Sequence, residues 1–181
     1  MIARRRQEVR EALARLGARP RWLDFLDAQY APSPAVEQIA AAVENALVEA
    51  GLDAVFMPLG LFHSDHALVH AAAMLLFGRR PKRCWFAYED AMYRRIEQLL
   101  PERLEQLAGE GVVATLAGES RGTQLGKKRR AIACYRSQLR ALRTPGRPGY
   151  ADALRPERYW RLDLPAEGPM PVAGAATRRP A

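Results

Sequence analysis

Two histidines and an aspartate lie within four residues of this chain, in the stretch His63-Ser64-Asp65-His66. Imidazole nitrogens bind zinc and exchange protons near neutral pH, and a neighbouring carboxylate can orient an imidazole ring. The stretch therefore predicts a metal and catalytic site. The alternative is a loop in which Asp65 caps the following helix, because zinc needs three or more protein ligands and the sequence shows only this one cluster.

The place of this cluster between two expected elements favours a functional role. Residues 53–60 are a short apolar run closed by Pro58 and Gly60, which is typical of a buried strand, and residues 67–77 are expected to be helical. Open α/β sheets bind ligands at the carboxyl ends of their strands. Glu89 and Asp90 follow a second expected strand, so they either face the same site or cap the next helix.

A third histidine, His70, lies four residues after His66 and would share a helix face with it. Its neighbours are Leu68, Val69 and a run of alanines. A histidine on a mainly apolar helix is more often packed against its sheet than bound to metal. We therefore interpret His70 as a packed residue.

Helix and strand patterns alternate along the chain, which predicts an α/β fold with a mostly parallel sheet. Residues 1–164 are expected to form one domain, and residues 165–181 are expected to be disordered because they are rich in Pro and Gly and have no apolar period. The expected strands are 22–26, 53–60, 83–88 and 112–116. The expected helices are 1–16, 34–50 with Ser33 as its cap, 67–77, 91–100, 101–108 and 127–142, and residues 156–162 form a last ordered segment.

A strand followed by His-x-Asp-His and an alanine-rich helix resembles the third motif of the LmbE/PIG-L family of zinc-dependent deacetylases. The match spans residues 4 to 162, and its specific part is His-x-Asp-His. Other stretches fall in the family's order, namely Arg6-Gln7-Glu8 in a helix that ends at Leu16-Gly17, Tyr88-Glu89 after a strand, and Lys128, Ala131 and Ser137-Gln138.

The resemblance implies a Rossmann-like three-layer sandwich with zinc as cofactor, acting on the acetamide of an N-acetylglucosamine-like sugar or related conjugate. It implies that His66 binds zinc and that His63 stabilises the oxyanion of the tetrahedral intermediate. Asp65 would orient a neighbouring imidazole. A small-molecule amino-sugar conjugate is the partner that this activity requires.

The chain also departs from the family pattern. The family's N-terminal Ala-His-Pro-Asp-Asp motif, which supplies two zinc ligands and a general base, is absent from this sequence, so the N-terminal βα portion is expected to be missing. Ser64 stands where proline is common, and Tyr135 stands where histidine is common. The second hypothesis is therefore a non-catalytic α/β binding module, or an inactive fragment, derived from that family.

Composition restricts the other possibilities. The 181 residues carry a net charge of +8, with basic runs at Arg4-Arg5-Arg6 and Lys127-Lys128-Arg129-Arg130. Because only three of the 28 basic residues are lysine and no nucleic-acid-binding motif is visible, we expect solvated helix faces, or a surface for anionic glycan or phosphate groups, rather than nucleic-acid binding. The oligomeric state is not specified.

Cysteine content and hydropathy indicate the compartment. Cys84 and Cys134 are far apart and lack a CxxC arrangement, so we expect two small buried residues rather than a disulfide or a thiolate zinc site. The longest apolar stretch, residues 67–77, is too short to span a bilayer, and no secretory signal is visible. A cytoplasmic protein is expected.

Overall fold

The computed structural model describes residues 2–26, 32–119, 122–139 and 149–165. The predicted tail, residues 165–181, lies outside these residues except for Pro165. The elements in chain order are α1 (Ile2–Leu16), α2 (Val36–Ala50), β1 (Ala54–Pro58), α3 (Ser64–Arg79), β2 (Cys84–Tyr88), the 3₁₀ helix η1 (Ala91–Tyr93), α4 (Leu99–Gly109), β3 (Val113–Glu119), α5 (Gly122–Ile132), α6 (Arg136–Leu139), α7 (Tyr150–Ala153) and β4 (Arg158–Asp163). In the described part of the chain, no helix is long and apolar enough to cross a membrane.

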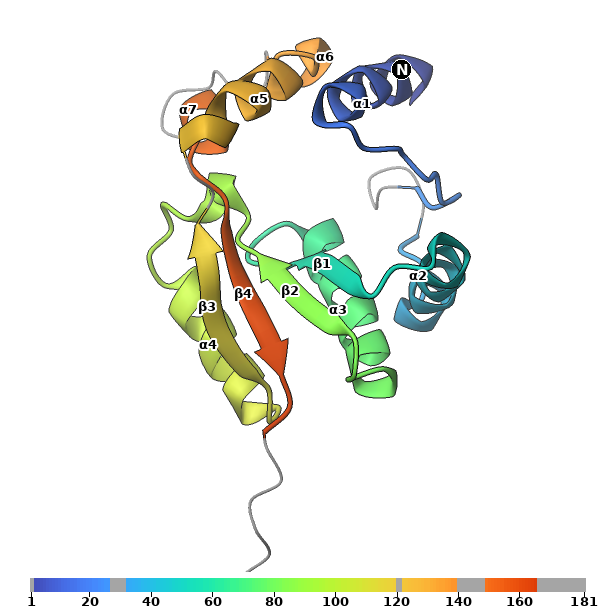
Figure 1. The fold of residues 1–181 in the computed structure, drawn as a ribbon, viewed down its shortest axis with the longest axis vertical. Coiled ribbons are helices and arrows are strands. Elements are labelled where there is room, and N and C mark those ends of the chain that lie inside the picture. The colour runs from blue at the N-terminus through green and yellow to red at the C-terminus, as the bar shows by residue number, and fades with distance from the viewer. Residues whose placement is uncertain (1, 27–31, 120–121, 140–148, 166–181) are drawn as a thin grey trace, which may run out of the picture.

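The four strands form one sheet in the order β1-β2-β4-β3. Strands β1 and β2 are parallel, whereas β4 is antiparallel to both β2 and β3. Three of the four strands therefore run in one direction, and the predicted α/β fold with a mostly parallel sheet is confirmed. The last ordered segment is β4, which inserts between β2 and β3 (Figure 1).

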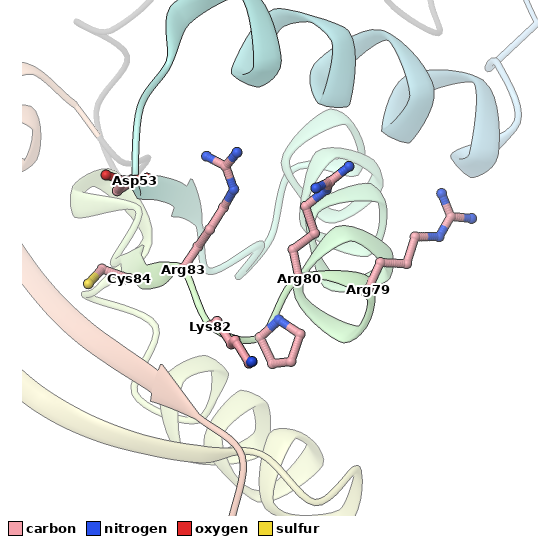
Figure 2. Close-up of a pocket in the computed structure, with 7 residues that line it drawn as sticks. Asp53, Arg79, Arg80, Lys82, Arg83 and Cys84 are labelled. Carbon is pink, nitrogen blue, oxygen red and sulfur yellow. The ribbon is translucent and has the colours of Figure 1, made fainter.

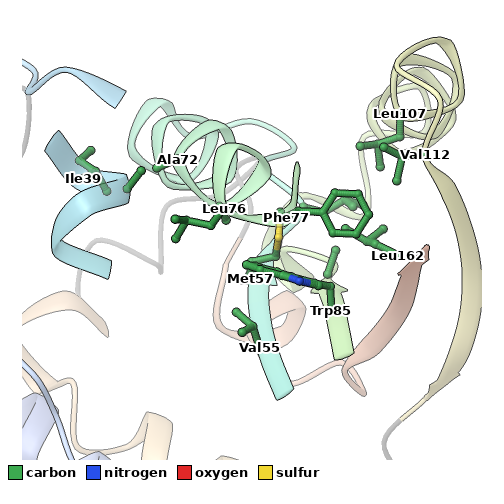
Figure 3. Packing of buried hydrophobic residues seen from close by; sticks show 14 of the residues in the cluster. Ile39, Val55, Met57, Ala72, Leu76, Phe77, Trp85, Leu107, Val112 and Leu162 are labelled. Atoms are coloured by element: carbon green, nitrogen blue, oxygen red, sulfur yellow. The ribbon is translucent and has the colours of Figure 1, made fainter. Parts of the chain in front are cut away.

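The core lies between one face of this sheet and helices α3 and α4. Alternate strand residues point toward the helices, as the two-residue period of a strand requires. Figure 3 shows Met57 and Trp85 against Phe77 of α3, and Leu162 beside Leu107 of α4. The ring of Phe77 meets that of Trp85 edge to face, with centroids 5.9 Å apart. Burial of these side chains fixes α3, and with it the start of α3 where the histidines lie.

The opposite face of the sheet carries an aromatic group. Phe56 stacks on Phe86 with ring centroids 4.8 Å apart and meets Tyr159 edge to face. Phe56 nevertheless remains 55% exposed. Helices α1 and α5 pack against each other beyond the end of the sheet at which β3 ends (Figure 1).

Three local predictions were wrong. Residues 22–26 form no strand, because Trp22 stacks with the guanidinium groups of Arg6 and Arg10 instead of pairing with the sheet. The predicted helix 91–100 is a 3₁₀ turn at its start, and α4 begins only at Leu99. The helix predicted over 127–142 ends at Ile132, and residues 140–142 lie outside the described part.

The end of α5 has a tertiary cause. The carboxylate of Glu8 on α1 accepts hydrogen bonds from the backbone N–H of Ser137, at 2.9 Å, and from its hydroxyl, at 2.5 Å. This contact satisfies the N–H that a continuous helix would direct to a preceding carbonyl. Two stretches that carry the family resemblance, Arg6-Gln7-Glu8 and Ser137-Gln138, are thereby brought into contact.

Candidate functional site

The site is built at the edge where the parallel strands β1 and β2 end. The chain leaves both strands side by side, because the N–H of Leu59 donates to the carbonyl of Tyr88 at 2.9 Å, one step beyond the last residue of β1. The connection from β1 to α3 and the connection from β2 to η1 therefore start at the same edge. This is the location at which α/β sheets present polar residues to ligands.

Gly60 sets how closely α3 approaches the end of β1. Its φ of +72° is in the left-handed region, and a Cβ built on it would lie 2.9 Å from the Cβ of His70 and 3.2 Å from the Cα of Ala67. Only glycine fits such a turn without displacing the helix. The close approach places the first turn of α3, with His66, directly over the strand ends.

His63 is the N-cap of α3. Its Nδ1 accepts a hydrogen bond from the backbone N–H of Asp65 at 3.2 Å, so in the neutral ring the proton is on Nε2. The prediction that Asp65 caps this helix is therefore wrong: a histidine nitrogen fills that role, and Asp65 lies in the first turn, where its charge offsets the helix dipole. Half of the His63 ring remains exposed, and Nε2–H is available to a ligand.

His66 is held by a buried carboxylate. Its Nδ1 lies 2.7 Å from Oδ1 of Asp90, whose side chain is 3% exposed. The other oxygen of Asp90 accepts the backbone N–H of Leu61 at 3.0 Å, so both carboxylate oxygens are engaged. The hydrogen bond that His66 donates to Asp90 raises the pKa of His66 above its ordinary value of 6.5, although partial burial opposes the shift.

This arrangement fixes the tautomer and the orientation of the His66 ring. A carboxylate that accepts the Nδ1 proton directs the Nε2 lone pair away from the protein, as in metal-binding histidines. Asp90, which follows β2, contacts both Leu61 in the loop after β1 and His66 in α3. These contacts hold the His66 ring in one orientation. The predicted cluster is therefore brought together with a residue 24 positions further along the chain.

Of the two acidic residues that follow β2, only Asp90 reaches the histidines. Asp90 makes no capping hydrogen bond to η1, so the capping alternative does not hold for it. Glu89 points elsewhere and is 1% exposed. It accepts a hydrogen bond from the indole N–H of Trp160 at 2.8 Å and pairs with Arg94 and Arg158, which makes it a buried structural charge that ties β2 to β4.

The ring of Tyr93 borders His66, and the ring of Phe62 packs on Tyr93. Tyr93 lies with its ring centroid 6.5 Å from that of His66 and 4.9 Å from that of Phe62. Burial raises the pKa of Tyr93, and the charge of Asp90 adds to the shift, so its hydroxyl stays protonated and can donate. Phe62 is 63% exposed. The site thus has an apolar side next to its polar one.

His70 is packed, as predicted. Its Nδ1 lies 3.0 Å from the carbonyl oxygen of Pro58, and the residue is 4% exposed. Burial lowers the pKa of this histidine, which keeps it neutral so that Nδ1–H donates to the carbonyl. The side chain binds α3 to β1 and is not available to a metal.

The described residues fit zinc only in part. His66 has the carboxylate partner and the free nitrogen that a zinc ligand needs, and the ring of His63 lies 5.4 Å from it, centroid to centroid. In residues 2–26, 32–119, 122–139 and 149–165, however, no three His, Cys, Asp or Glu side chains gather closely enough to hold a metal ion. Within these residues His66 is a single candidate ligand, and a full ligand set is absent from them.

Comparison with known proteins finds solved structures of the same fold. No family model and no curated protein matches the sequence. The structure superposes on the zinc-inhibited form of teicoplanin deacetylase Orf2 with a TM-score of 0.71 over 92% of this chain and 76% of that one, at 17% identity. It superposes on the A40926 pseudoaglycone deacetylase Dbv21 with a TM-score of 0.67 over 91% of this chain and 72% of that one, at 24% identity.

The chain has the fold of these deacetylases. A triple mutant of the teicoplanin-pathway deacetylase matches as well, with a TM-score of 0.68 and 20% identity over 92% of this chain and 73% of that one. At these identities the likeness establishes the shared architecture.

A pocket at the opposite edge of the sheet has a structural explanation. It is lined by residues 79–84 and Asp53, at the starts of β1 and β2 (Figure 2). Arg80 pairs with Glu44 of α2 at 2.8 Å, and Arg83 donates to the carbonyl of Leu52. These basic side chains dock the turn after α3 onto α2 and lie near the C-terminus of α3, where positive charge is favourable. Cys84, in the same pocket, is exposed, which corrects the prediction that both cysteines are buried, whereas Cys134 is buried as expected.

Proposed function

We propose that this protein is a zinc-dependent deacetylase that hydrolyses the acetamide of an N-acetylglucosamine-like sugar within a larger conjugate such as a glycopeptide. The observation that carries the proposal is the pair formed by His66 and the buried Asp90, next to the N-capping His63, at the carboxyl ends of two parallel strands. The shared fold with deacetylases of teicoplanin and A40926 supports the reaction and the substrate class.

His66 would hold the metal through Nε2, with Asp90 fixing its tautomer. Bound zinc supplies a polarised acyl carbonyl and a water molecule of lowered pKa. The proposed reaction would consume one water molecule and release acetate and a free amine. Among the described residues only His66 is oriented in this way, so the proposal requires further zinc ligands and a general base besides them.

His63 would act on the acyl oxygen. Its Nδ1 is occupied by the backbone N–H of Asp65, so Nε2–H is the donor that can meet negative charge as it develops on that oxygen. Removal of such a donor lowers turnover on the order of 10²–10³-fold.

Two alanine variants separate these roles. His66→Ala is expected to abolish zinc retention and activity, whereas His63→Ala is expected to retain zinc and lose turnover, so each variant is the control for the other. Zinc per chain and acetate release from an N-acetylglucosaminyl glycopeptide are the two measurements. Zinc should be titrated from below to above one equivalent, since one structural neighbour is a zinc-inhibited form. Unchanged zinc content in His66→Ala would remove the assignment.

A binding module without catalysis is the second candidate, and the incomplete ligand set in the described residues favours it. Calorimetric titration with an N-acetylglucosamine conjugate distinguishes the two. Saturable binding without acetate release, in the presence of zinc, would establish the binding module and reject the deacetylase. Acetate release that depends on His66 would do the reverse.

A further inference from the structure

The positive charge of this protein is concentrated in two stretches of sequence. Residues 2–26 and 122–139 contain twelve Lys or Arg and three Asp or Glu, a net charge of +9, whereas the whole chain has +8. The remaining residues are therefore close to neutral. A charge distribution this uneven points to an anionic partner for the charged part.

The two stretches form one part of the molecule. Helix α1 packs against α5, with Ala12 buried against Ala131 and Cys134 (Figure 1). We call α1, the following residues 17–26, α5 and α6 the basic layer. Lys127 and Arg130 of α5 are exposed in it.

The basic layer also exposes large apolar side chains. Trp22 lies between two arginines, with the guanidinium carbons of Arg6 and Arg10 at 5.2 and 5.7 Å from its ring centroid. Between 37% and 54% of the surface of each of five apolar residues is exposed, and these are Ile2, Leu16, Trp22, Phe25 and Leu26. Trp22, Phe25 and Leu26 lie in the irregular segment after α1, and exposed aromatic and aliphatic side chains beside arginines suit a membrane interface.

We propose that the basic layer binds the surface of a membrane rich in anionic lipids. Lipid headgroups neutralise the arginines and lysines, while the boundary with the acyl chains accepts Trp22, Phe25 and Leu26. A nucleic acid offers phosphate but would leave these apolar side chains in water. A second copy of the chain would present the same positive charge and repel the first.

The basic layer lies beyond the same end of the sheet as the candidate site. Helix α5 follows β3, whose end lies at the same edge of the sheet as the ends of β1 and β2. Docking through α1 and α5 therefore brings the edge that carries His66 toward the lipid surface. The proposal does not depend on the deacetylase assignment, because the surface is described without it.

Cosedimentation of the full chain with vesicles tests the proposal. The chain is expected to bind vesicles of phosphatidylcholine with 30% phosphatidylserine, and not vesicles of phosphatidylcholine alone. Since one Lys or Arg near an anionic surface changes partitioning by about fivefold, Lys127→Glu with Arg130→Glu should weaken binding by at least about 25-fold. Trp22→Ala should weaken the binding that persists at high salt.

The matched control is Arg79→Glu with Lys82→Glu, which changes the net charge equally at the opposite edge of the sheet. This variant should bind like the wild type, and circular dichroism should show that both double variants are folded. Equal loss in both double variants would overturn the proposal, because net charge alone would then explain binding. Binding of a single-stranded oligonucleotide at a salt concentration where anionic vesicles are not bound would also overturn it.

Discussion

Replacing Asp90 with Asn should cost metal affinity and stability together. The Asp90 side chain is 3% exposed and accepts two N–H donors, from Leu61 at 3.0 Å and from His66 at 2.7 Å. Asparagine offers one acceptor oxygen and one NH₂ group of the same size. Whichever way the amide is turned, one of the two donors faces another donor.

The two orientations have different costs. If the NH₂ faces the N–H of Leu61, a buried backbone donor loses its acceptor, which destabilises the fold by about 1–3 kcal/mol. If the NH₂ faces His66, the ring must carry its proton on Nε2, and that nitrogen can no longer bind zinc. Loss of such a partner typically lowers metal affinity by roughly 10–100-fold.

The assay is zinc affinity by competition with a chelating dye, together with thermal unfolding and the ¹⁵N chemical shifts of the His66 ring. Asp65→Asn is the control, because Asp65 is 35% exposed and makes only a 4.0 Å contact with His63. We expect this control to change zinc affinity by no more than about twofold. If Asp90→Asn has wild-type zinc affinity, tautomer and melting temperature, the argument that Asp90 positions His66 is refuted.

Three further outcomes follow from the geometry. Gly60→Ala should lower the free energy of unfolding in urea by roughly 2–4 kcal/mol, because the new Cβ would lie at a positive φ and only 2.9 Å from the Cβ of His70. A loss below about 0.5 kcal/mol would contradict the close packing of α3 on Gly60. The hydrogen bond from Ser137 lowers the pKa of Glu8 below its ordinary 4.5, so this contact stabilises the protein above pH 4.5 and loses its effect as the pH falls through the lowered pKa. Glu8→Gln should therefore make the melting temperature depend less on pH below about pH 5. An unchanged pH dependence of the melting temperature in this variant would argue against the contact. A thiol reagent should label Cys84 alone in the native protein and Cys134 only after unfolding, and two fast thiols would show that Cys134 is not buried.

Patterns of neighbouring residues predicted most of the helices and strands, and they predicted that residues 63–66 form a polar cluster between a strand and a helix. The apolar run before His63 and the alanine-rich stretch after it form β1 and α3, because both are decided by residues close in sequence. The strand-end argument placed Glu89 and Asp90 near the site. It could not choose between them, since the direction of each side chain depends on the pairing of β2 with β1 and β4.

The errors arise where tertiary contacts override local preference. His63 rather than Asp65 caps α3, because the position of the cap depends on where the chain turns at Gly60. The break after Ile132 depends on Glu8, which is more than 100 residues away. Strand β4 has partners on both sides, and nothing in its own sequence specifies that it runs antiparallel between them.

The central claim is that His66 takes part in hydrolysis of an acetamide. The most direct measurement is acetate released from an N-acetylglucosaminyl glycopeptide by the zinc-loaded wild type and by His66→Ala at equal concentration. We expect time-dependent release by the wild type, proportional to enzyme concentration, and none above background by the variant. Equal release from both proteins, or none from a wild type that has bound one zinc per chain, would contradict it.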